Sequence, residues 1–362
     1  MKNLVLAAAC CGLFISFAHA QQDMLKAVKV DKAPAVDGDP SDEAWAKAPA
    51  LSLAFPEVSL KAVYTNDGIY LLARWPDTTF SIVRGGSWTW DGAKWTMTKS
   101  AAPEAGPGMS EDRLTFMWNM TVPDFEGLGC MTKCHVDVQP GKEKTVRIFL
   151  EAGVADIWHM KSARALPSVG ASQSGEVKVG KDGQPTAGTF TLTGYCDDQW
   201  VGEWKDTPDG GRYSDEGKGA SSPNQNKEKT GPLYIETAPA DYIDAMTLRQ
   251  TEIDAGEAVE AAGLDAAKVS DIWAKYTALG ARVPECILTK PEGSRADITQ
   301  AAVWKDGVWT TEFRRDLDTG HSKDDAIFKD LTKPYLFGIA ILDNCGGKDH
   351  VTSGVIALVF EQ

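Results

Sequence analysis

Short strand-like runs separated by turn residues recur along most of this 362-residue chain. Residues 60–64 and 69–75 are two such runs, and Asn66-Asp67-Gly68 between them is typical of a hairpin turn. Further runs occupy residues 113–118, 145–150, 189–192, 233–236, 301–304, 308–313, 335–342 and 354–360. Many short strands with turns between them predict a mainly β fold, an antiparallel β-sandwich.

Two stretches depart from this pattern. Residues 214–229 are rich in Gly, Ser, Asn and Lys and predict an exposed loop insertion. Residues 255–279 are rich in Ala and Glu, carry apolar residues at roughly helical spacing and predict a helical insertion, interrupted near Gly263. Ser41 is a candidate N-cap for a short helical turn that carries Trp45. We expect residues 21–362 to form a single domain around these insertions.

The first twenty residues have the features of a signal peptide. Lys2 precedes an apolar run over residues 4–17, and Ala18-His19-Ala20 offers small residues for cleavage before Gln21. A lipoprotein signal with Cys10 is the weaker alternative, because Ala7-Ala8-Ala9 lacks a large aliphatic residue before it. No later stretch is long and apolar enough to predict a transmembrane segment. We therefore expect residues 1–20 to be removed and the protein to be exported to the periplasm.

Acidic residues outnumber basic ones, with a formal net charge of −14 for the whole chain. This balance argues against nucleic acid and anionic membranes as partners. It suits docking on a basic protein partner, although acidity that serves only solubility is an equal alternative. Five cysteines follow the signal peptide, and an odd number does not form a complete disulfide framework.

The most informative segment is Cys130-Met-Thr-Lys-Cys134-His135, one residue longer than the usual attachment motif of a c-type haem. Two nearby thiols can add to the two vinyl groups of a porphyrin, and the adjacent imidazole can reach the iron. Two alternatives remain open. Cys130 and Cys134 could form a disulfide, which is nearly as well supported by these residues, or they could join His135 in a zinc site that lacks an obvious fourth ligand.

A second cluster holds three possible iron ligands in a row, namely His159, Met160 and Lys161. If this segment is a strand, His159 and Lys161 share one face and Met160 takes the other. The simpler alternative is a surface lysine and a packed methionine. The chain also has twelve tryptophans, Trp158 among them, and core packing accounts for most tryptophans better than the walls of a ligand site do.

Several blocks together resemble the ethylbenzene dehydrogenase-related haem-binding domain, and their order covers most of residues 28–361. They are residues 36–45, 64–79, 111–118 and 313–320, together with Asp156-Ile-Trp-His-Met-Lys161 and Asp197-Asp198. The resemblance implies a β-sandwich of the kind seen in family 9 carbohydrate-binding modules. It also implies a haem subunit of a periplasmic molybdenum enzyme of the dimethyl sulfoxide reductase type, or a related cytochrome c-552-like domain.

In that family a b-type haem is held between an axial Met and an axial Lys. The Lys lies in a Trp-x-Trp-Lys stretch that Trp158-His-Met-Lys161 resembles, so the resemblance implies that Lys161 is an axial ligand. Met131 could be the axial Met. The favoured expectation is a c-type haem attached through Cys130 and Cys134, with His135 as the second ligand. A b-type haem, and Met131 or His159 as ligands, are the alternatives.

These features predict a periplasmic electron-transfer protein with one haem, without catalysis of its own. Its partner would be a basic redox protein, or a molybdenum or iron–sulfur oxidoreductase of which this chain is the cytochrome subunit. The competing function is a binding module for carbohydrate or another small ligand, without haem and with a Cys130–Cys134 disulfide. The remaining cysteines suggest a Cys196–Cys345 or Cys286–Cys345 bridge, between which spacing does not choose.

Overall fold

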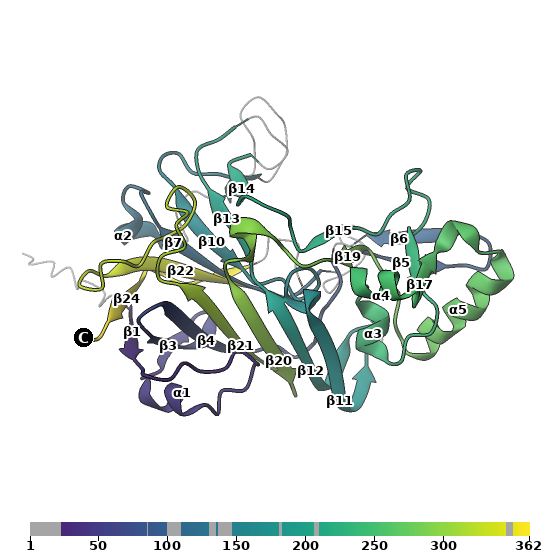
Figure 1. Cartoon of the computed structure of the whole chain (residues 1–362), viewed down its shortest axis with the longest axis horizontal. Helices are drawn as coiled ribbons and strands as arrows, with labels where there is room; N and C mark the ends of the chain where they lie inside the picture. The colour runs from purple at the N-terminus through teal and green to yellow at the C-terminus, as the bar shows by residue number, and fades with distance from the viewer. Residues whose placement is uncertain are drawn as a thin grey trace, which may run out of the picture.

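A computed structural model describes eight stretches of the chain, residues 23–84, 86–99, 110–129, 135–136, 147–180, 183–205, 210–344 and 350–362. Strands dominate these stretches and helices are few and short, which confirms the predicted mainly β class (Figure 1). The longest described helix has only thirteen residues, and none within these stretches has the length and apolar character needed to cross a bilayer.

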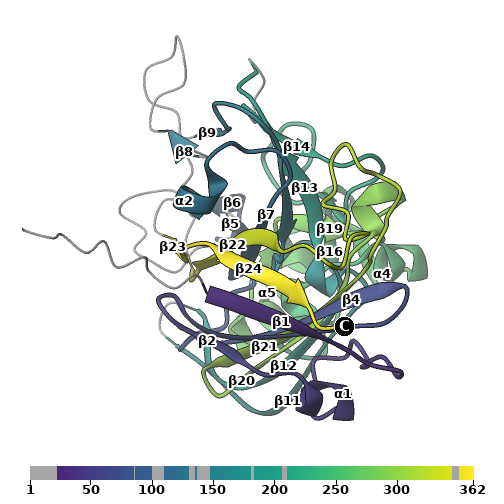
Figure 2. The same cartoon turned by 90° about the vertical axis from the view of Figure 1, so that its left-hand side faces the viewer.

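One large sheet folds over itself into two facing layers, which confirms the predicted sandwich (Figures 1 and 2). The first layer runs in the order β11 (Gly170–Val179), β12 (Pro185–Tyr195), β20 (Thr299–Lys305), β21 (Val308–Asp316), β4 (Gly68–Pro76), β3 (Glu57–Tyr64) and β2 (Leu51–Ala54). The second runs in the order β24 (Ile356–Phe360), β22 (Tyr335–Leu342), β7 (Arg113–Asn119), β10 (Ala155–His159), β13 (Asp197–Val201) and β14 (Arg212–Ser214), and β23 (Val351–Thr352) pairs with β22.

Strand β1 (Asp23–Lys29) joins the two layers. It pairs in parallel with β24 on one side and with β3 on the other. The remaining pairings within both layers are antiparallel, as predicted, so the parallel pairs mark the corner at which the sheet turns. The predicted hairpin is the β3–β4 pair, in which Thr65 donates its backbone N–H to the carbonyl of Gly68 at 2.9 Å.

Aromatic side chains fill the space between the layers. Phe116 of β7 meets Phe313 of β21 edge to face, with 5.3 Å between ring centroids. Such pairs add roughly 0.5–1.5 kcal/mol beyond the burial of their area. Six tryptophans are fully buried, namely Trp45, Trp88, Trp118, Trp158, Trp304 and Trp309. Core packing, and not a ligand wall, is therefore the role of these six side chains. Trp118, Trp158, Trp304 and Trp309 lie on strands of the sandwich, whereas Trp45 lies in a short helix and Trp88 in the smaller lobe described below.

A smaller lobe extends from the sandwich on the right of Figure 1. It contains β5 (Gly86–Trp90), β6 (Trp95–Lys99), β15 (Ser221–Pro223), β16 (Tyr234–Glu236), β17 (Ala258–Glu260), β18 (Val283–Pro284), β19 (Cys286–Leu288), α3 (Tyr242–Met246), α4 (Gln250–Ala255) and α5 (Ala266–Ala278). Helix α5 occupies the second half of the predicted helical insertion. The first half instead includes β17, which pairs with β16, and a 3₁₀ turn over Ala261–Gly263. The predicted loop 214–229 contains the short strand β15.

The short helix near the N-terminus is α1 (Glu43–Lys47). It begins one residue later than the proposed cap requires, because Asp42 and not Ser41 stands at the N-cap position. Trp45 within α1 donates its indole N–H to Oε1 of Glu312 at 2.6 Å. This buried hydrogen bond ties the N-terminal segment to β21.

Candidate functional site on strand β10

Strand β10 carries the predicted ligand cluster and lies between β7 and β13. Trp158 pairs with Phe116 on one side and with Asp198 on the other, and His159 pairs with Asp197. Because side chains alternate along a strand, the two faces of β10 carry different sets. We call the face toward the first layer the inner face and the opposite one the outer face. All five residues of β10 are buried, so both faces are covered.

Lys161 follows β10 and lies on the outer face with only 2% of its surface exposed. Its ammonium group forms an ion pair with Asp197 and donates to Oε1 of Gln199 at 3.3 Å. The other oxygen of Asp197 accepts from Nη2 of Arg295 at 2.8 Å. Lys161 is therefore a buried amine held by two acceptors from β13.

Burial, together with the positive charges of Arg164 and Arg212, lowers the pKa of Lys161 to about 7, while Asp197 opposes them. An unperturbed lysine has a pKa of about 10.4, so it is almost wholly protonated at neutral pH. Lys161 is divided between its charged and neutral forms near pH 7. A neutral amine has the free electron pair that a metal ligand needs.

The same surroundings favour the charged form of Asp197, whereas they favour the neutral form of Lys161. Although burial raises the pKa of its carboxyl group, the charges of Lys161 and Arg295 outweigh burial and hold that pKa well below the ordinary value. Asp197 is therefore ionised at neutral pH and remains an acceptor for Lys161 in either protonation state of the lysine.

His159 lies beside this group, on the outer face, with 6% of its surface exposed. Its Nε2 is buried and has no hydrogen-bond partner among the described residues. Burial lowers the pKa of the imidazole well below its ordinary value, and the charges of Lys161 and Arg113 add to that effect. The ring is therefore neutral, and a neutral imidazole nitrogen without a partner is a candidate ligand.

A second buried ion-pair group positions the chain after β10. The fully buried Glu111 accepts from Arg164 at 2.8 Å and from the backbone N–H of Ala163 at 3.1 Å, and it pairs with Arg113 at 3.2 Å. Burial opposes ionisation of Glu111, but Arg164 and Arg113 lower its pKa below the ordinary value. This carboxylate fixes the segment that immediately follows Lys161.

The predicted haem-attachment segment falls largely outside the described residues. Cys130, Met131 and Cys134 lie outside them, and His135 is described only as a backbone residue of β8 (His135–Val136), which pairs with β9 (Arg147–Ile148). Both flanks of the segment pack on the outer face. Phe125 of α2 (Phe125–Leu128) and Leu150 join an apolar cluster that also includes Ala155, Ile157 and Val201.

Trp158 lies on the inner face, opposite His159 and Lys161. Its indole N–H donates to Oδ2 of Asp156 at 3.1 Å, and the guanidinium of Arg315 lies 4.5 Å from its ring centroid. Met160 is also buried in the core between the layers. The structure thus brings His159 and Lys161 together and separates Trp158 from them by the thickness of the sheet.

Comparison with protein families matches residues 31–352 to the family described as ethylbenzene dehydrogenase. The chain belongs to the ethylbenzene dehydrogenase family. The match covers most of the chain, including β10 and both flanks of residues 130–135. No curated protein matches this member of the family.

The sequence of this ethylbenzene dehydrogenase family member does not by itself reveal the partners of Lys161. Asp197 was noted only as part of an Asp197-Asp198 pair, and Gln199 was not singled out. Alternation within β13 places Asp197 and Gln199 on one face, which is a signal that a strand assignment would have revealed. Arg295 comes from a 3₁₀ turn (Gly293–Ala296) and lies 98 residues after Asp197 in the sequence. No local pattern therefore connects it to Asp197 or to β10.

Two of the remaining cysteines of this family member are described. Cys196 and Cys286 are buried free thiols, and Cys286 donates to the carbonyl of Ala163 at 3.3 Å. Burial raises the pKa of Cys286 to about 12 and that of Cys196 well above its ordinary value. Both thiols are therefore protonated and unreactive at neutral pH. Because both thiols are free, the predicted Cys196–Cys345 and Cys286–Cys345 bridges are not formed, and Cys345 itself lies outside the described residues.

Proposed function

We propose that the protein is an exported electron-transfer protein that binds one haem on the outer face of β10. The observation that carries the proposal is the pair formed by Lys161 and His159. A buried lysine with a pKa of about 7 lies on the same face as a neutral imidazole whose Nε2 has no partner in the described part of the chain. Both groups suit a metal ligand, and haem iron supplies reversible one-electron transfer.

Asp197 and Gln199 suit a lysine that binds iron. A neutral amine that gives its electron pair to a metal keeps two N–H bonds, and Lys161 already has two acceptors for them. Partners of this kind orient a ligand and raise its basicity. Arg295 keeps Asp197 ionised, so the acceptor persists when Lys161 loses its proton.

The haem is c-type in our proposal, with thioether bonds to Cys130 and Cys134 and with His135 and Lys161 as axial ligands. The packing of Phe125 and Leu150 on the outer face supports this arrangement, because it brings both flanks of residues 130–135 to the face that carries Lys161. A b-type haem with Met131 is the alternative, and His159 is the rival of Lys161 for the iron.

Family membership supports a physiological context for this haem. The ethylbenzene dehydrogenase name suggests a molybdenum oxidoreductase, of which this chain would be the electron-transfer subunit. We further propose that residues 1–20 direct it to the periplasm. A net charge of −14 for the whole chain favours a basic redox partner, whose association would slow as ionic strength rises.

The first test is purification of the exported protein from a host with haem-maturation machinery. We expect one haem per chain and a Soret band. Lys161→Met should shift the Soret band or release the haem, whereas Lys178→Met, at an exposed lysine of β11, should leave the spectrum unchanged. A protein without iron and without a Soret band would overturn the proposal. An unchanged spectrum in Lys161→Met would exclude this lysine as the ligand.

A second test distinguishes the two haem types and the competing binding module. Haem should resist acid–acetone extraction from the native protein but not from a Cys130→Ala, Cys134→Ala double variant. Intact mass should increase by one haem in the native protein. A mass that instead shows loss of two hydrogens, with no haem, would favour a Cys130–Cys134 disulfide and a small-ligand binding module.

A further inference from the structure

We propose that the inner core binds a calcium ion through Asp156, Asp198, Asp215 and Asp325. Asp156 comes from β10 and Asp198 from β13, whereas Asp215 follows β14 and Asp325 lies in the loop after β21. The group therefore comes from two strands of one layer and two connecting segments. This site lies on the opposite face of β10 from Lys161 and is independent of the proposed haem.

The first argument is geometric. Asp156, Asp198 and Asp325 each offer a carboxylate oxygen, and these three oxygens all lie within 4.8 Å of one another. Calcium binds oxygen at roughly 2.3–2.6 Å, so two ligands of one ion are at most about 5 Å apart. The three carboxylates can therefore reach a common ion without movement of the strands.

The second argument is the absence of partners for these oxygens. Asp198 is fully buried, and neither of its carboxylate oxygens has a hydrogen-bond partner in the described part of the chain. The same holds for the Oδ1 atoms of Asp156, Asp215 and Asp325. Buried polar atoms are almost always paired, and unpaired groups cost free energy. Among the described residues, five buried carboxylate oxygens of these four aspartates are thus unpaired, which indicates a missing ligand with positive charge.

Charge balance leads to the same conclusion. The buried guanidinium of Arg315 lies 2.7 Å from Asp156 and 4.0 Å from Asp325, and it supplies one positive charge. Four ionised aspartates would leave three negative charges uncompensated. Burial and the neighbouring carboxylates together raise the pKa of Asp198 well above its ordinary value and that of Asp215 to about 9. A divalent cation would replace the protons that these groups otherwise retain.

The donor set selects calcium among divalent ions. The four candidate ligands are carboxylates, which hard cations prefer, and calcium accepts six to eight oxygens in flexible geometry. Magnesium requires near-ideal octahedral geometry and keeps several waters, which suits a fully buried group less well. The imidazole of His321 lies 4.0 Å from Asp325 and is hydrogen-bonded to Asp297 at 2.8 Å.

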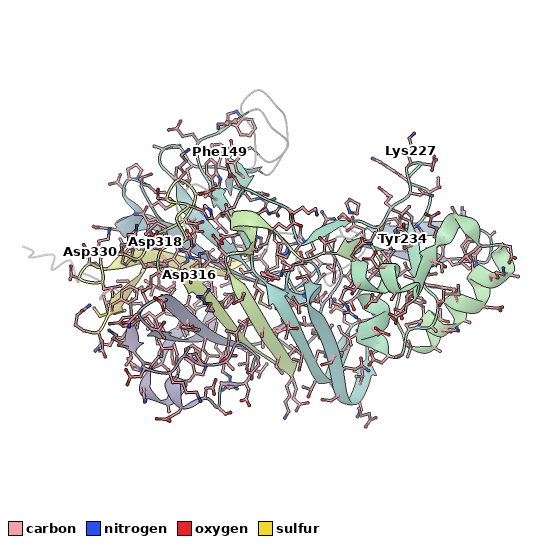
Figure 3. The ribbon with its side chains drawn as sticks, viewed as in Figure 1. Phe149, Lys227, Tyr234, Asp316, Asp318 and Asp330 are labelled. Atoms are coloured by element: carbon pink, nitrogen blue, oxygen red, sulfur yellow. The ribbon has the colours of Figure 1, made fainter. Side chains whose placement is uncertain are left out.

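The segment that carries Asp325 also provides a matched control. Asp316 and Asp318 lie near the end of β21 (Figure 3), and each has its own basic partner. Asp318 pairs with Lys329 and Asp316 pairs with Arg314. Asp318→Asn therefore removes one carboxylate from the same segment without touching the proposed site.

The test uses the full exported protein after treatment with EGTA. Titration with calcium chloride, followed calorimetrically, should reveal one calcium ion per chain, and bound calcium should raise the unfolding temperature by several degrees. Magnesium chloride should bind at least ten-fold more weakly. Asp198→Asn should abolish calcium binding, whereas Asp318→Asn should retain the affinity of the native protein.

Three outcomes would overturn the proposal. They are the absence of calcium binding at millimolar concentration, magnesium affinity equal to that of calcium, and full calcium affinity in Asp198→Asn. If Asp198→Asn does not fold, Asp215→Asn replaces it, with an expected loss of at least ten-fold in affinity, and unchanged affinity would overturn the site. Haem-free and haem-loaded preparations should give the same result, so failure of the haem proposal does not affect the test.

Discussion

The pKa values of carboxyl groups shift in opposite directions on the two faces of β10. On the outer face Asp197 has two cationic partners, Lys161 and Arg295, and its pKa is depressed. On the inner face the adjacent residue Asp198 has no hydrogen-bond partner among the described residues, and its pKa is raised. Both side chains come from β13, where Asp198 is fully buried and Asp197 is 13% exposed. Their neighbours, and not burial alone, therefore decide which one is ionised.

This difference suggests two roles for one strand. The outer face holds an amine that can lose its proton and bind a metal, which suits the proposed haem. The inner face holds more negative charge than Arg315 compensates, which suits the proposed calcium ion. The variants below test whether the two faces are as separate as this comparison implies.

The largest effect should come from Arg315→Met. This substitution leaves Asp156, Asp198 and Asp325 buried without their shared cation, and breaking a buried ion pair costs about 3–5 kcal/mol. Arg314→Met is the control, because Arg314 is one third exposed in its pair with Asp316, and exposed pairs contribute roughly 0–1 kcal/mol. Urea unfolding measures both. Equal losses in the two variants would contradict the buried network.

The next largest difference should separate Asp197→Asn from Asp198→Asn. Asp197→Asn leaves Lys161 and Arg295 without their shared carboxylate, and we expect a loss of about 2–3 kcal/mol in the free energy of unfolding. In EGTA, Asp198→Asn should change that free energy by less than about 1 kcal/mol, because burial and the neighbouring carboxylates already disfavour the ionised form of Asp198 and raise its pKa. Guanidinium unfolding of both variants measures the contrast, and a reversed order would refute it.

The inner face should also make stability depend on pH. The pKa of Asp215 is about 9 in the folded protein, owing to burial and to Asp156, Asp325 and Asp324 nearby, against about 3.8 when unfolded. The folded state therefore binds more protons between these values, and its stability falls as pH rises from about 4 through about 9. Saturating calcium should flatten this fall. Unfolding in EGTA and in calcium at several pH values measures it, and identical slopes would count against the site.

The outer face should make a contribution of opposite sign over a narrower pH range, so its total effect on stability is smaller. Burial lowers the pKa of Lys161 to about 7 from 10.5, so the unfolded chain binds more protons between these values. Stability should therefore rise as pH increases from about 7 to about 10. Lys161→Met should remove this rise from the haem-free protein, whereas Lys178→Met should retain it. Unfolding of both variants at several pH values and a fixed calcium concentration isolates the contribution of Lys161 to the pH dependence of stability. If stability still rises with pH in Lys161→Met, another group is responsible for that rise.

Local patterns predicted most strands because alternation and turn residues act over short distances. The hairpin across Asn66-Asp67-Gly68 is the β3–β4 pair, and residues 335–342 form β22. The helical stretch was only half right. Apolar spacing over residues 255–279 predicts one interrupted helix, but part of its first half forms β17 and pairs with β16, since a neighbouring strand can override a weak helical preference.

The sequence alone determined the mainly β class, the family resemblance and, through alternation, the separation of Met160 from His159 and Lys161. It also identified Cys130–His135 as the segment on which the haem type depends. Only the tertiary structure decided which partners these residues meet. Arg295 reaches Asp197, and Asp215 and Asp325 approach Asp198, from segments far along the chain. Because pKa values depend on charges close in space, the contrast between the two faces of β10 arises only when the layers and loops are assembled.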